Sequence, residues 1–423
     1  RSTPLYSSAA SDVYKRQDQA DEKDGPTTET TDEPDAAKRQ EKTNPEAKDD
    51  DYGVRAGRSV TLPVLENDTD ADGDVLTASV KAPPTGAVVS RVRGGEALSL
   101  AVPSGASGSY SFTYTADDGR GGRSDADVKV SVVPDSVNEA PAQRRPSSVV
   151  LGARGEATYS LLGDFRDPES DPIFLVGVDQ AEGLSVKMRP DGVVTVKHLG
   201  TGGAGVKPLA VRVSDGTKTG SGVLNVTVRS EKAAPVANAD HVTALKGQTV
   251  VVEPLANDVD PNGAPLRLTT VEQAAAGLAV VPDYSGGTFR LTATTAGTFY
   301  VGYQVANDSA AQASGLVRVD VAEPAPGNPV PADDLAILPL GGSVLGEPLA
   351  NDTDPAGGVL VLKSVAVPPE AGMAVEIVDH DLLRISAPAG LTVPVDVAYV
   401  VSNGVGEATG DWFVVFGGAM PTR

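Results

Sequence analysis

From residue 49 onward, apolar and polar residues alternate in short runs separated by turn residues. In one run, Tyr110, Phe112 and Tyr114 alternate with Ser111 and Thr113. Further alternating runs end at Val132, Val213, Val305 and Val401. Because successive side chains of a β-strand point to opposite faces, this period of two predicts strands with one buried face. No stretch has the spacing of an amphipathic helix, so we expect an all-β chain.

An acidic, turn-like segment between two large apolar residues recurs along the chain. Its four copies run from Leu65 to Leu76, Leu162 to Ile173, Leu255 to Leu266 and Leu349 to Leu360. Ten residues separate the anchors in each copy, and successive copies start 97, 93 and 94 residues apart. A repeat of this size holds roughly seven short strands, the size of an immunoglobulin-like sandwich. We predict four tandem Ig-like Greek-key β-sandwiches, numbered as modules 1 to 4: 49–135, 136–231, 232–324 and 325–423.

A second signal lies late in each module, where a pair of turn-forming residues follows an alternating run. The pairs are Asp118-Gly119, Asp215-Gly216, Asn307-Asp308 and Asn403-Gly404. Asp, Asn and Gly adopt the backbone conformations that reverse a strand, so the last two strands of each module are predicted to form a hairpin.

Segments containing proline separate the modules, at Pro134–Pro141, up to Pro235, and at Pro324–Pro331. Proline stiffens a connection, which favours an elongated array. Residues 18–48 contain no Val, Ile, Leu or aromatic residue and many charges, so we interpret them as a disordered acidic linker. A phosphorylated or partner-binding tail is the alternative. Residues 1–17 resemble a translated sequencing adapter and are set aside.

Charge and cysteine content exclude several classes of function. The formal net charge of −22 repels phosphate backbones and anionic lipid, which argues against binding to nucleic acid or to a membrane surface. The chain has no cysteine, which excludes disulfides, thiolate nucleophiles and cysteine-based metal sites. No apolar run reaches the roughly 18–20 residues of a membrane-spanning helix.

The combination of L-x-N-D-x-D with a late Y-x-x-x-D-G resembles the tandem bacterial Ig-like, cadherin-like domains of large secreted and surface proteins. Composition and linkers are most similar to those of actinobacterial surface proteins that also carry fibronectin type III modules. The resemblance covers residues 49 to about 416. It implies export, a multidomain parent whose signal and anchor lie outside this chain, and a role in display, adhesion or spacing. The second copy departs, with Gly163-Asp164-Phe165 in place of the Asn-Asp pair.

The first acidic segment is a candidate calcium site. Asp68, Asp70, Asp72 and Asp74 follow the opening half of an EF-hand loop, in which alternate oxygens converge on a hard cation. The second half fails, because Ser79 stands where a bidentate glutamate is expected. The other copies hold fewer ligands. The competing interpretation is that these side chains cap their own backbone in a tight turn.

Enzyme interpretations find little support. The histidines His198, His241 and His380 fall at unrelated positions of different modules, and the paired acids Asp72 and Asp74 share one turn rather than facing each other across a cleft. Carbohydrate could stack on Trp412 with Phe413 and Phe416, but packing in the sandwich or against a following domain is the preferred interpretation of these residues.

We therefore predict a non-catalytic, monomeric stalk or adhesion array on the cell surface or outside the cell, with a glycan or protein ligand. The alternative is an accessory, carbohydrate-binding or spacer region of a larger secreted polysaccharide-degrading enzyme.

Overall fold

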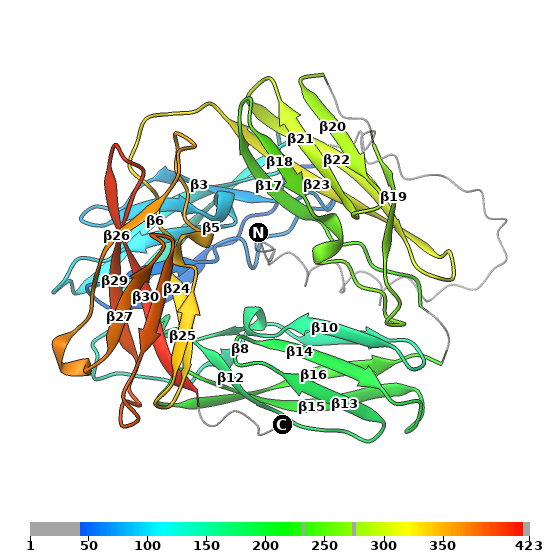
Figure 1. The fold of residues 1–423 in the computed structure, drawn as a ribbon, viewed down its shortest axis with the longest axis horizontal. Coiled ribbons are helices and arrows are strands. Elements are labelled where there is room, and N and C mark those ends of the chain that lie inside the picture. The colour runs from blue at the N-terminus through cyan, green and yellow to red at the C-terminus, as the bar shows by residue number, and fades with distance from the viewer. Residues whose placement is uncertain (1–42, 231–232, 273–275, 418–423) are drawn as a thin grey trace.

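Four β-sandwiches follow one another along the chain, as predicted (Figure 1). The computed structural model describes residues 43–230, 233–272 and 276–417. Apart from short 3-10 turns, the regular structure of these residues is strand. The adapter-like segment and most of the predicted linker lie outside the described residues.

Modules 1, 3 and 4 have seven strands each. Module 1 contains β1 (Asp50–Val54), β2 (Ser59–Leu62), β3 (Thr77–Ala82), β4 (Val88–Val92), β5 (Ala97–Ala101), β6 (Gly108–Asp117) and β7 (Arg123–Val132). Module 3 contains β17 (Asp240–Leu245), β18 (Thr249–Val252), β19 (Arg267–Val271), β20 (Leu278–Asp283), β21 (Thr288–Ala293), β22 (Gly297–Ala306) and β23 (Gln312–Ala322). Module 4 contains β24 (Asp334–Pro339), β25 (Ser343–Gly346), β26 (Val361–Ala366), β27 (Ala374–Val378), β28 (Leu382–Ser386), β29 (Val395–Ser402) and β30 (Glu407–Gly417).

Module 2 has the same seven strands and two short additions. Its strands are β8 (Ala142–Gln143), β9 (Ser147–Leu151), β10 (Glu156–Ser160), β11 (Phe165–Arg166), β12 (Phe174–Val178), β13 (Leu184–Met188), β14 (Val193–His198), β15 (Gly205–Ser214) and β16 (Thr219–Val228). The additional strands β8 and β11 pair with each other.

Each module packs a four-stranded sheet against a three-stranded one. In module 1 the strand orders are β1-β7-β6-β3 and β2-β5-β4, and the other modules repeat them. The last two strands form the predicted hairpin in every module. The first strand pairs with the last one in parallel, as β1 does with β7 and β17 with β23. The two strands through which the chain enters and leaves a module are therefore neighbours.

The alternating residues predicted to face inward do so. Phe112 and Tyr114 on β6 are buried in the core of module 1 together with Val128 and Val130 of β7. Modules 2, 3 and 4 have separate cores of the same kind. Each sandwich is thus a hydrophobic unit of its own.

Module 1 begins before residue 49, which corrects the predicted end of the linker. Glu46 forms an antiparallel bridge with Thr69, and the amide and hydroxyl of Thr43 donate hydrogen bonds to the carboxylate of Asp72. Residues 43–48 lack large apolar side chains, but their backbone lies along the acidic turn and is held by it.

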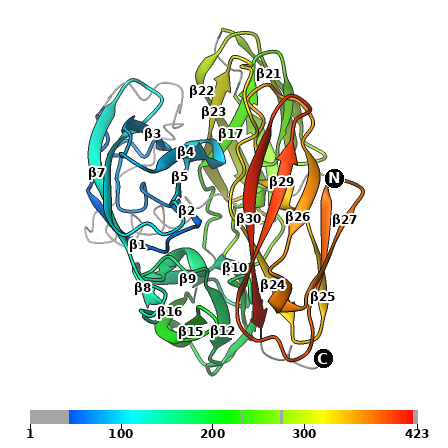
Figure 2. The same ribbon diagram turned by 90° about the vertical axis from the view of Figure 1, so that its left-hand side faces the viewer.

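The modules are not arranged as an elongated rod, in contrast to the prediction. Module 1 contacts modules 2, 3 and 4, and the chain folds back on itself (Figures 1 and 2). The physical reason lies on the outer faces of the sheets. Phe413 and Val415 of β30 point away from the core of module 4 and pack against Phe174 of module 2. Burying such apolar side chains between modules is favourable, so the modules pack against one another. The proline-containing linkers had led us to expect separated modules.

A buried arginine joins modules 1 and 3. Arg318 on β23 is 2% exposed, and its guanidinium donates to the carbonyls of Val75 and Asp117 at 2.6 Å each and to the Thr77 hydroxyl at 3.0 Å. Close by, the His241 imidazole lies 2.9 Å from Asp320 of its own module and 3.4 Å from Glu96 of module 1. Burial lowers the pKa of His241, but the hydrogen bonds that its ring donates to these two carboxylates outweigh burial, so the pKa is raised.

Replacing this arginine should open the array. In Arg318→Leu two buried carbonyls lose a charged donor, which costs about 1–3 kcal/mol of contact free energy. We expect the radius of gyration measured by small-angle X-ray scattering to increase while circular dichroism still reports folded sandwiches. Arg290→Leu, at an exposed position of β21 in the same module, is the matched control. An unchanged radius in Arg318→Leu would show that the arginine does not hold the modules together.

Candidate functional site

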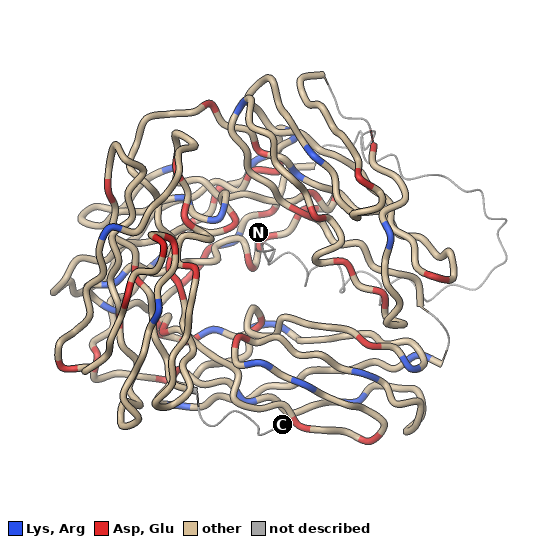
Figure 3. Tube along the Cα trace, in the orientation of Figure 1, with Lys and Arg blue, Asp and Glu red and all other residues tan. Residues whose placement is uncertain are grey.

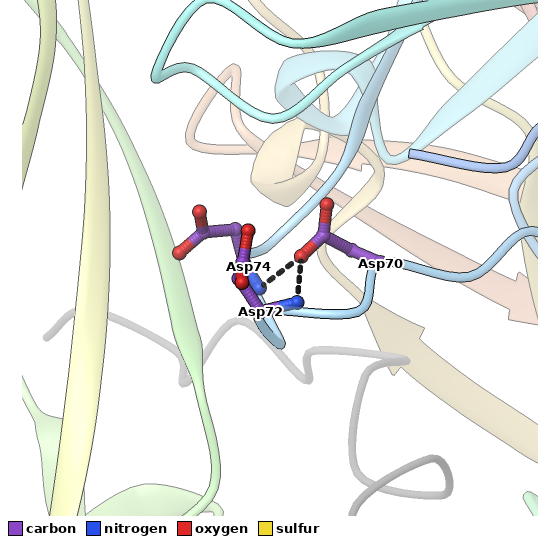
Figure 4. A group of neighbouring side chains, drawn as sticks. All are labelled: Asp70, Asp72 and Asp74. Atoms are coloured by element: carbon purple, nitrogen blue, oxygen red, sulfur yellow. Dashed lines mark hydrogen bonds between the residues drawn. The ribbon is translucent and has the colours of Figure 1, made fainter. Parts of the chain in front are cut away.

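The acidic segments close tight turns by the same hydrogen bonds in all four modules. One carboxylate oxygen of Asp70 accepts the amides of Asp72 and Asp74, at 2.9 and 3.1 Å (Figure 4). Asp167, Asp260 and Asp354 likewise accept the amides two and four residues further on. The interpretation that these side chains cap their own backbone is confirmed.

The Asn-Asp pair fastens the chain that enters the module. Asp68 accepts the amide of Lys48 at 2.8 Å, and the side chain of Asn67 donates to the carbonyl of Asp49. The equivalent aspartates Asp258 and Asp352 accept the amides of Asn238 and Ala332, again 20 residues earlier. These bonds carry the first strand to the place where it pairs with the last.

In the same three modules a buried tyrosine hydroxyl meets this aspartate. The Tyr114 hydroxyl lies 2.9 Å from Asp68 and 2.9 Å from the carbonyl of Val64. Tyr303 and Tyr399 make the equivalent contacts with Asp258 and Asp352. A second aspartate, the first residue of the first strand, faces the first one: Asp50, Asp240 and Asp334.

We did not anticipate the role of this second aspartate. It precedes the aspartate of the Asn-Asp pair by 18 residues in all three modules, a constant spacing that could have identified it. Burial raises the pKa of Asp50 to about 7 and that of Asp68 to about 6.

Module 2 has neither the aspartate pair nor the tyrosine at the equivalent positions. Ser147, Phe165 and Val211 occupy the positions of Asp50, Asp68 and Tyr114. The Phe165 ring lies over Gly222, where a Cβ atom would be 2.4 Å from it. In module 3 the tyrosine ring of Tyr303 lies over the equivalent Gly315, at 2.2 Å from such a Cβ.

The predicted calcium ligands separate into two groups. Asp70, Asp72 and Asp74 each offer an oxygen within 4.8 Å of the others. Asp68 is outside this group, with its carboxylate turned toward Tyr114 and the amide of Lys48. Burial raises the pKa of Asp74 to about 6. Arg120, whose guanidinium lies 3.0 Å from this carboxylate, opposes the rise.

The second acidic segment carries a similar group, Asp167, Glu169 and Asp171. Here a neighbouring module supplies the positive charge. Arg55 and Arg58 of module 1 both pair with Asp171, and Arg55 is 6% exposed.

Each acidic turn from module 2 onward contacts the preceding module near the end of β1, β9 or β17. The Ser170 hydroxyl donates to the carbonyl of Gly53 at 2.7 Å. The Gly152 amide donates to the carbonyl of Pro261, also at 2.7 Å. A Cβ on Gly357 would come within 2.4 Å of Leu245. The turns therefore form the joints between modules, a role that the sequence did not reveal. Acidic residues are found in all four modules (Figure 3).

The structure does not bring the three histidines together. His198 accepts the amide of Arg154 within module 2, His241 lies between modules 1 and 3, and His380 is exposed in a turn of module 4. Trp412 is 3% exposed in the core of module 4, and Phe413 lies between modules with the Arg58 guanidinium 5.1 Å above its ring.

Comparison with known proteins supports the type of domain. The family described as "Bacterial Ig domain" matches residues 42–131 and 232–320, which are modules 1 and 3. These modules are therefore similar in sequence to bacterial Ig domains, and the match and the repeated sandwiches together support a non-catalytic repeat array. No curated protein matches the chain.

Several solved structures align with the chain at low similarity. Sidekick-1 immunoglobulin domains 1–5 are 12% identical, with 89% of this chain and 80% of that chain covered and a TM-score of 0.25. The human desmocollin-1 ectodomain is 12% identical, with coverage of 90% and 80% and a TM-score of 0.19. An endo-fucoidan hydrolase from glycoside hydrolase family 107 is 19% identical, with 64% of this chain covered and a TM-score of 0.20. The alignment spans only 42% of that hydrolase.

The buried tyrosine hydroxyl should stabilise its module. Tyr303→Phe removes the hydroxyl that donates a hydrogen bond to the Asn238 carbonyl or to Asp258. We therefore expect the free energy of unfolding of module 3 to fall by about 1–3 kcal/mol. The measurement is hydrogen exchange of core amides on β22 and β23. Tyr284→Phe, which is 51% exposed in the same module, is the control. Equal exchange in the two variants would contradict a stabilising role.

Proposed function

We propose that this chain is a non-catalytic extracellular array that spaces or displays neighbouring modules and bears tension between its ends. The observation that carries the proposal is the parallel pairing of the first and last strands of every module: β1 with β7, β9 with β16, β17 with β23 and β24 with β30.

Tension applied through the two ends of such a module shears these strands along their length. The paired strands span five residues in modules 1 and 2 and six in modules 3 and 4. In shear the hydrogen bonds of the whole pair are loaded together, whereas a hairpin pulled apart from its open end breaks them one after another. The parallel pair is thus placed where a stalk requires mechanical resistance.

Other features support a role outside the cell. The bacterial Ig domain match covers two modules, and the excess of acidic residues limits self-association. Among the residues that the structure describes, no helix is long and apolar enough to cross a membrane. The folded-back arrangement fits a compact state of the stalk that tension would extend, because the modules keep separate cores.

The alternative, an accessory carbohydrate-binding region of a polysaccharide-degrading enzyme, has no specific observation in its favour. The aromatic residues that motivated it, Trp412, Phe413 and Phe416, are buried. They are not available to stack on a sugar in this arrangement.

Single-molecule force spectroscopy tests the proposed function. Pulled through its ends, the chain should unfold in four steps, each releasing about 300 Å for roughly 90 residues. Because the chain has no cysteine, an introduced pair such as Val206→Cys and Thr227→Cys provides unique handles at the open end of the β15–β16 hairpin. Pulling there should unzip module 2 at a clearly lower force. Equal forces in the two directions would contradict a tension-bearing design.

We also propose calcium binding by Asp70, Asp72 and Asp74 in module 1. The convergence of their oxygens supports it, and carboxylates are ligands that calcium prefers. Two groups compete with the ion: Thr43 donates to Asp72, and Arg120 lies against Asp74. We therefore expect an affinity in the range of about 10⁻⁴–10⁻³ M that is typical of extracellular modules.

A calcium titration of the full chain tests this site. At about 5 mM calcium, binding in that range should stabilise module 1 by roughly 1–2 kcal/mol and raise its melting temperature. Asp72→Asn should abolish the effect, whereas Arg120→Gln should strengthen binding by removing the competing charge. Asp308→Asn, in an exposed turn of module 3, is the control. If several millimolar calcium leaves every melting transition unchanged, the site does not exist.

A further inference from the structure

The half-buried aspartate pairs of modules 3 and 4 have more hydrogen-bond acceptors than donors. In module 4 the Tyr399 hydroxyl on β29 lies 3.0 Å from Asp334 and 3.1 Å from Asp352. The carbonyls of Ala332 and Pro348 approach the same hydroxyl at 3.4 and 3.5 Å. The hydroxyl has one proton to donate, so it can satisfy only one of these oxygens at a time.

Backbone amides do not supply enough donors for all of these acceptors. The amide of Ala332 donates to Asp352 at 2.9 Å, but in module 3 one carboxylate oxygen each of Asp240 and Asp258 is buried and has no hydrogen-bond partner. Leaving a buried acceptor unsatisfied is costly, and two facing carboxylates add their repulsion. The site therefore calls for one more positive charge.

A proton fits this requirement better than a metal ion. The tyrosine hydroxyl already occupies the space between the two carboxylates, with oxygens about 3 Å away on several sides. A calcium ion would need most of that space, because it takes 6–8 oxygen ligands at about 2.3–2.6 Å. A proton shared between the two carboxyl groups needs no additional volume and converts one acceptor into a donor.

We propose that the aspartate pair in each of modules 3 and 4 holds one proton at neutral pH, and that losing it to solvent at alkaline pH loosens the segment by which the chain enters the module. The pairs are Asp240 with Asp258 and Asp334 with Asp352. On ionisation the charge of a pair changes from −1 to −2. The proposal is independent of the tension-bearing role, and its test does not involve force.

The titration behaviour of these groups agrees with the geometry. Burial, followed by the charge of the partner, raises the pKa of Asp240 and of Asp334 to about 8, and burial raises that of Asp258 and Asp352 to about 7. Asp333 also faces the pair of module 4 and raises both values.

The direction of the pH effect follows from these shifts. The folded pKa values lie above the ordinary value of about 4, so the folded state binds the proton more tightly than the unfolded chain does. The stabilising contribution is complete below about pH 4 and is lost as the pH rises through about 7–8.

Module 2 is a comparison built into the chain. Ser147, Phe165 and Val211 replace the pair and its tyrosine. Its buried Asp164 is a single acid, which accepts from the Tyr159 hydroxyl and has Arg145 at 3.4 Å. The entering segments of modules 3 and 4 should therefore loosen at alkaline pH, whereas the entering segment of module 2 has no such pair to ionise.

Nuclear magnetic resonance of the full chain tests the proposal. With ¹³C-labelled aspartate, one carboxyl group in each of the two pairs should titrate near neutral pH rather than near pH 4. Amide exchange of Ala332, corrected for its intrinsic pH dependence, should accelerate about ten-fold for each pH unit above the pKa of the pair. Asp334→Asn, a neutral replacement of similar shape, should remove this acceleration in module 4 alone. Asp381→Asn, in an exposed turn of the same module, should leave it unchanged.

Two results would overturn the proposal. The first is that all four paired carboxyl groups titrate below about pH 5 in the unsubstituted chain, a measurement that does not depend on any variant folding. The second is that the corrected exchange of Ala332 accelerates equally in Asp334→Asn and in the control.

Discussion

Each of modules 1, 3 and 4 depends on the hydrogen bonds that the aspartate of its Asn-Asp pair makes to the entering chain. Asp258, for example, accepts the amide of Asn238 and the hydroxyl of Tyr303, and so joins the linker, the acidic turn and the penultimate strand. These segments are far apart in sequence, and the parallel pairing of β17 with β23 requires that they meet. Removing this aspartate from water costs free energy, and its hydrogen bonds to the linker and to the tyrosine offset that cost.

Module 2 shows which part of this arrangement the fold itself requires. It keeps the same strand order although Phe165 and Val211 replace the aspartate and the tyrosine. An aromatic ring still covers the glycine on the last strand, but it comes from the turn instead of from the neighbouring strand. The constraint common to all modules is therefore volume, since a core needs to be filled whatever the polarity of the group. The buried acids are an additional feature of three modules.

The acidic turns serve three physical purposes at once. Their second aspartate closes the turn on itself, their Asn-Asp pair fastens the entering chain, and from module 2 onward their tip contacts the preceding module. Where carboxylates collect, arginines lie close by: Arg120 beside Asp74 within module 1, and Arg55 from module 1 beside Asp171 of module 2. Intermodule contact and charge compensation are thus coupled at these joints.

The sequence by itself determined the number of modules, the sandwich, the late hairpin and the turn chemistry, because these follow from local periodicity and from residues that cap their own backbone. It also placed Asp70, Asp72 and Asp74 on one turn. Only the tertiary structure separated Asp68 from them, since its partner Tyr114 is 46 residues away. The packing of the modules against one another was likewise decided in three dimensions, where outward-facing groups such as Arg318 and Phe413 find partners in modules far along the chain. The alternation of apolar and polar residues indicates which side chains of a strand are buried. It does not indicate which module buries them.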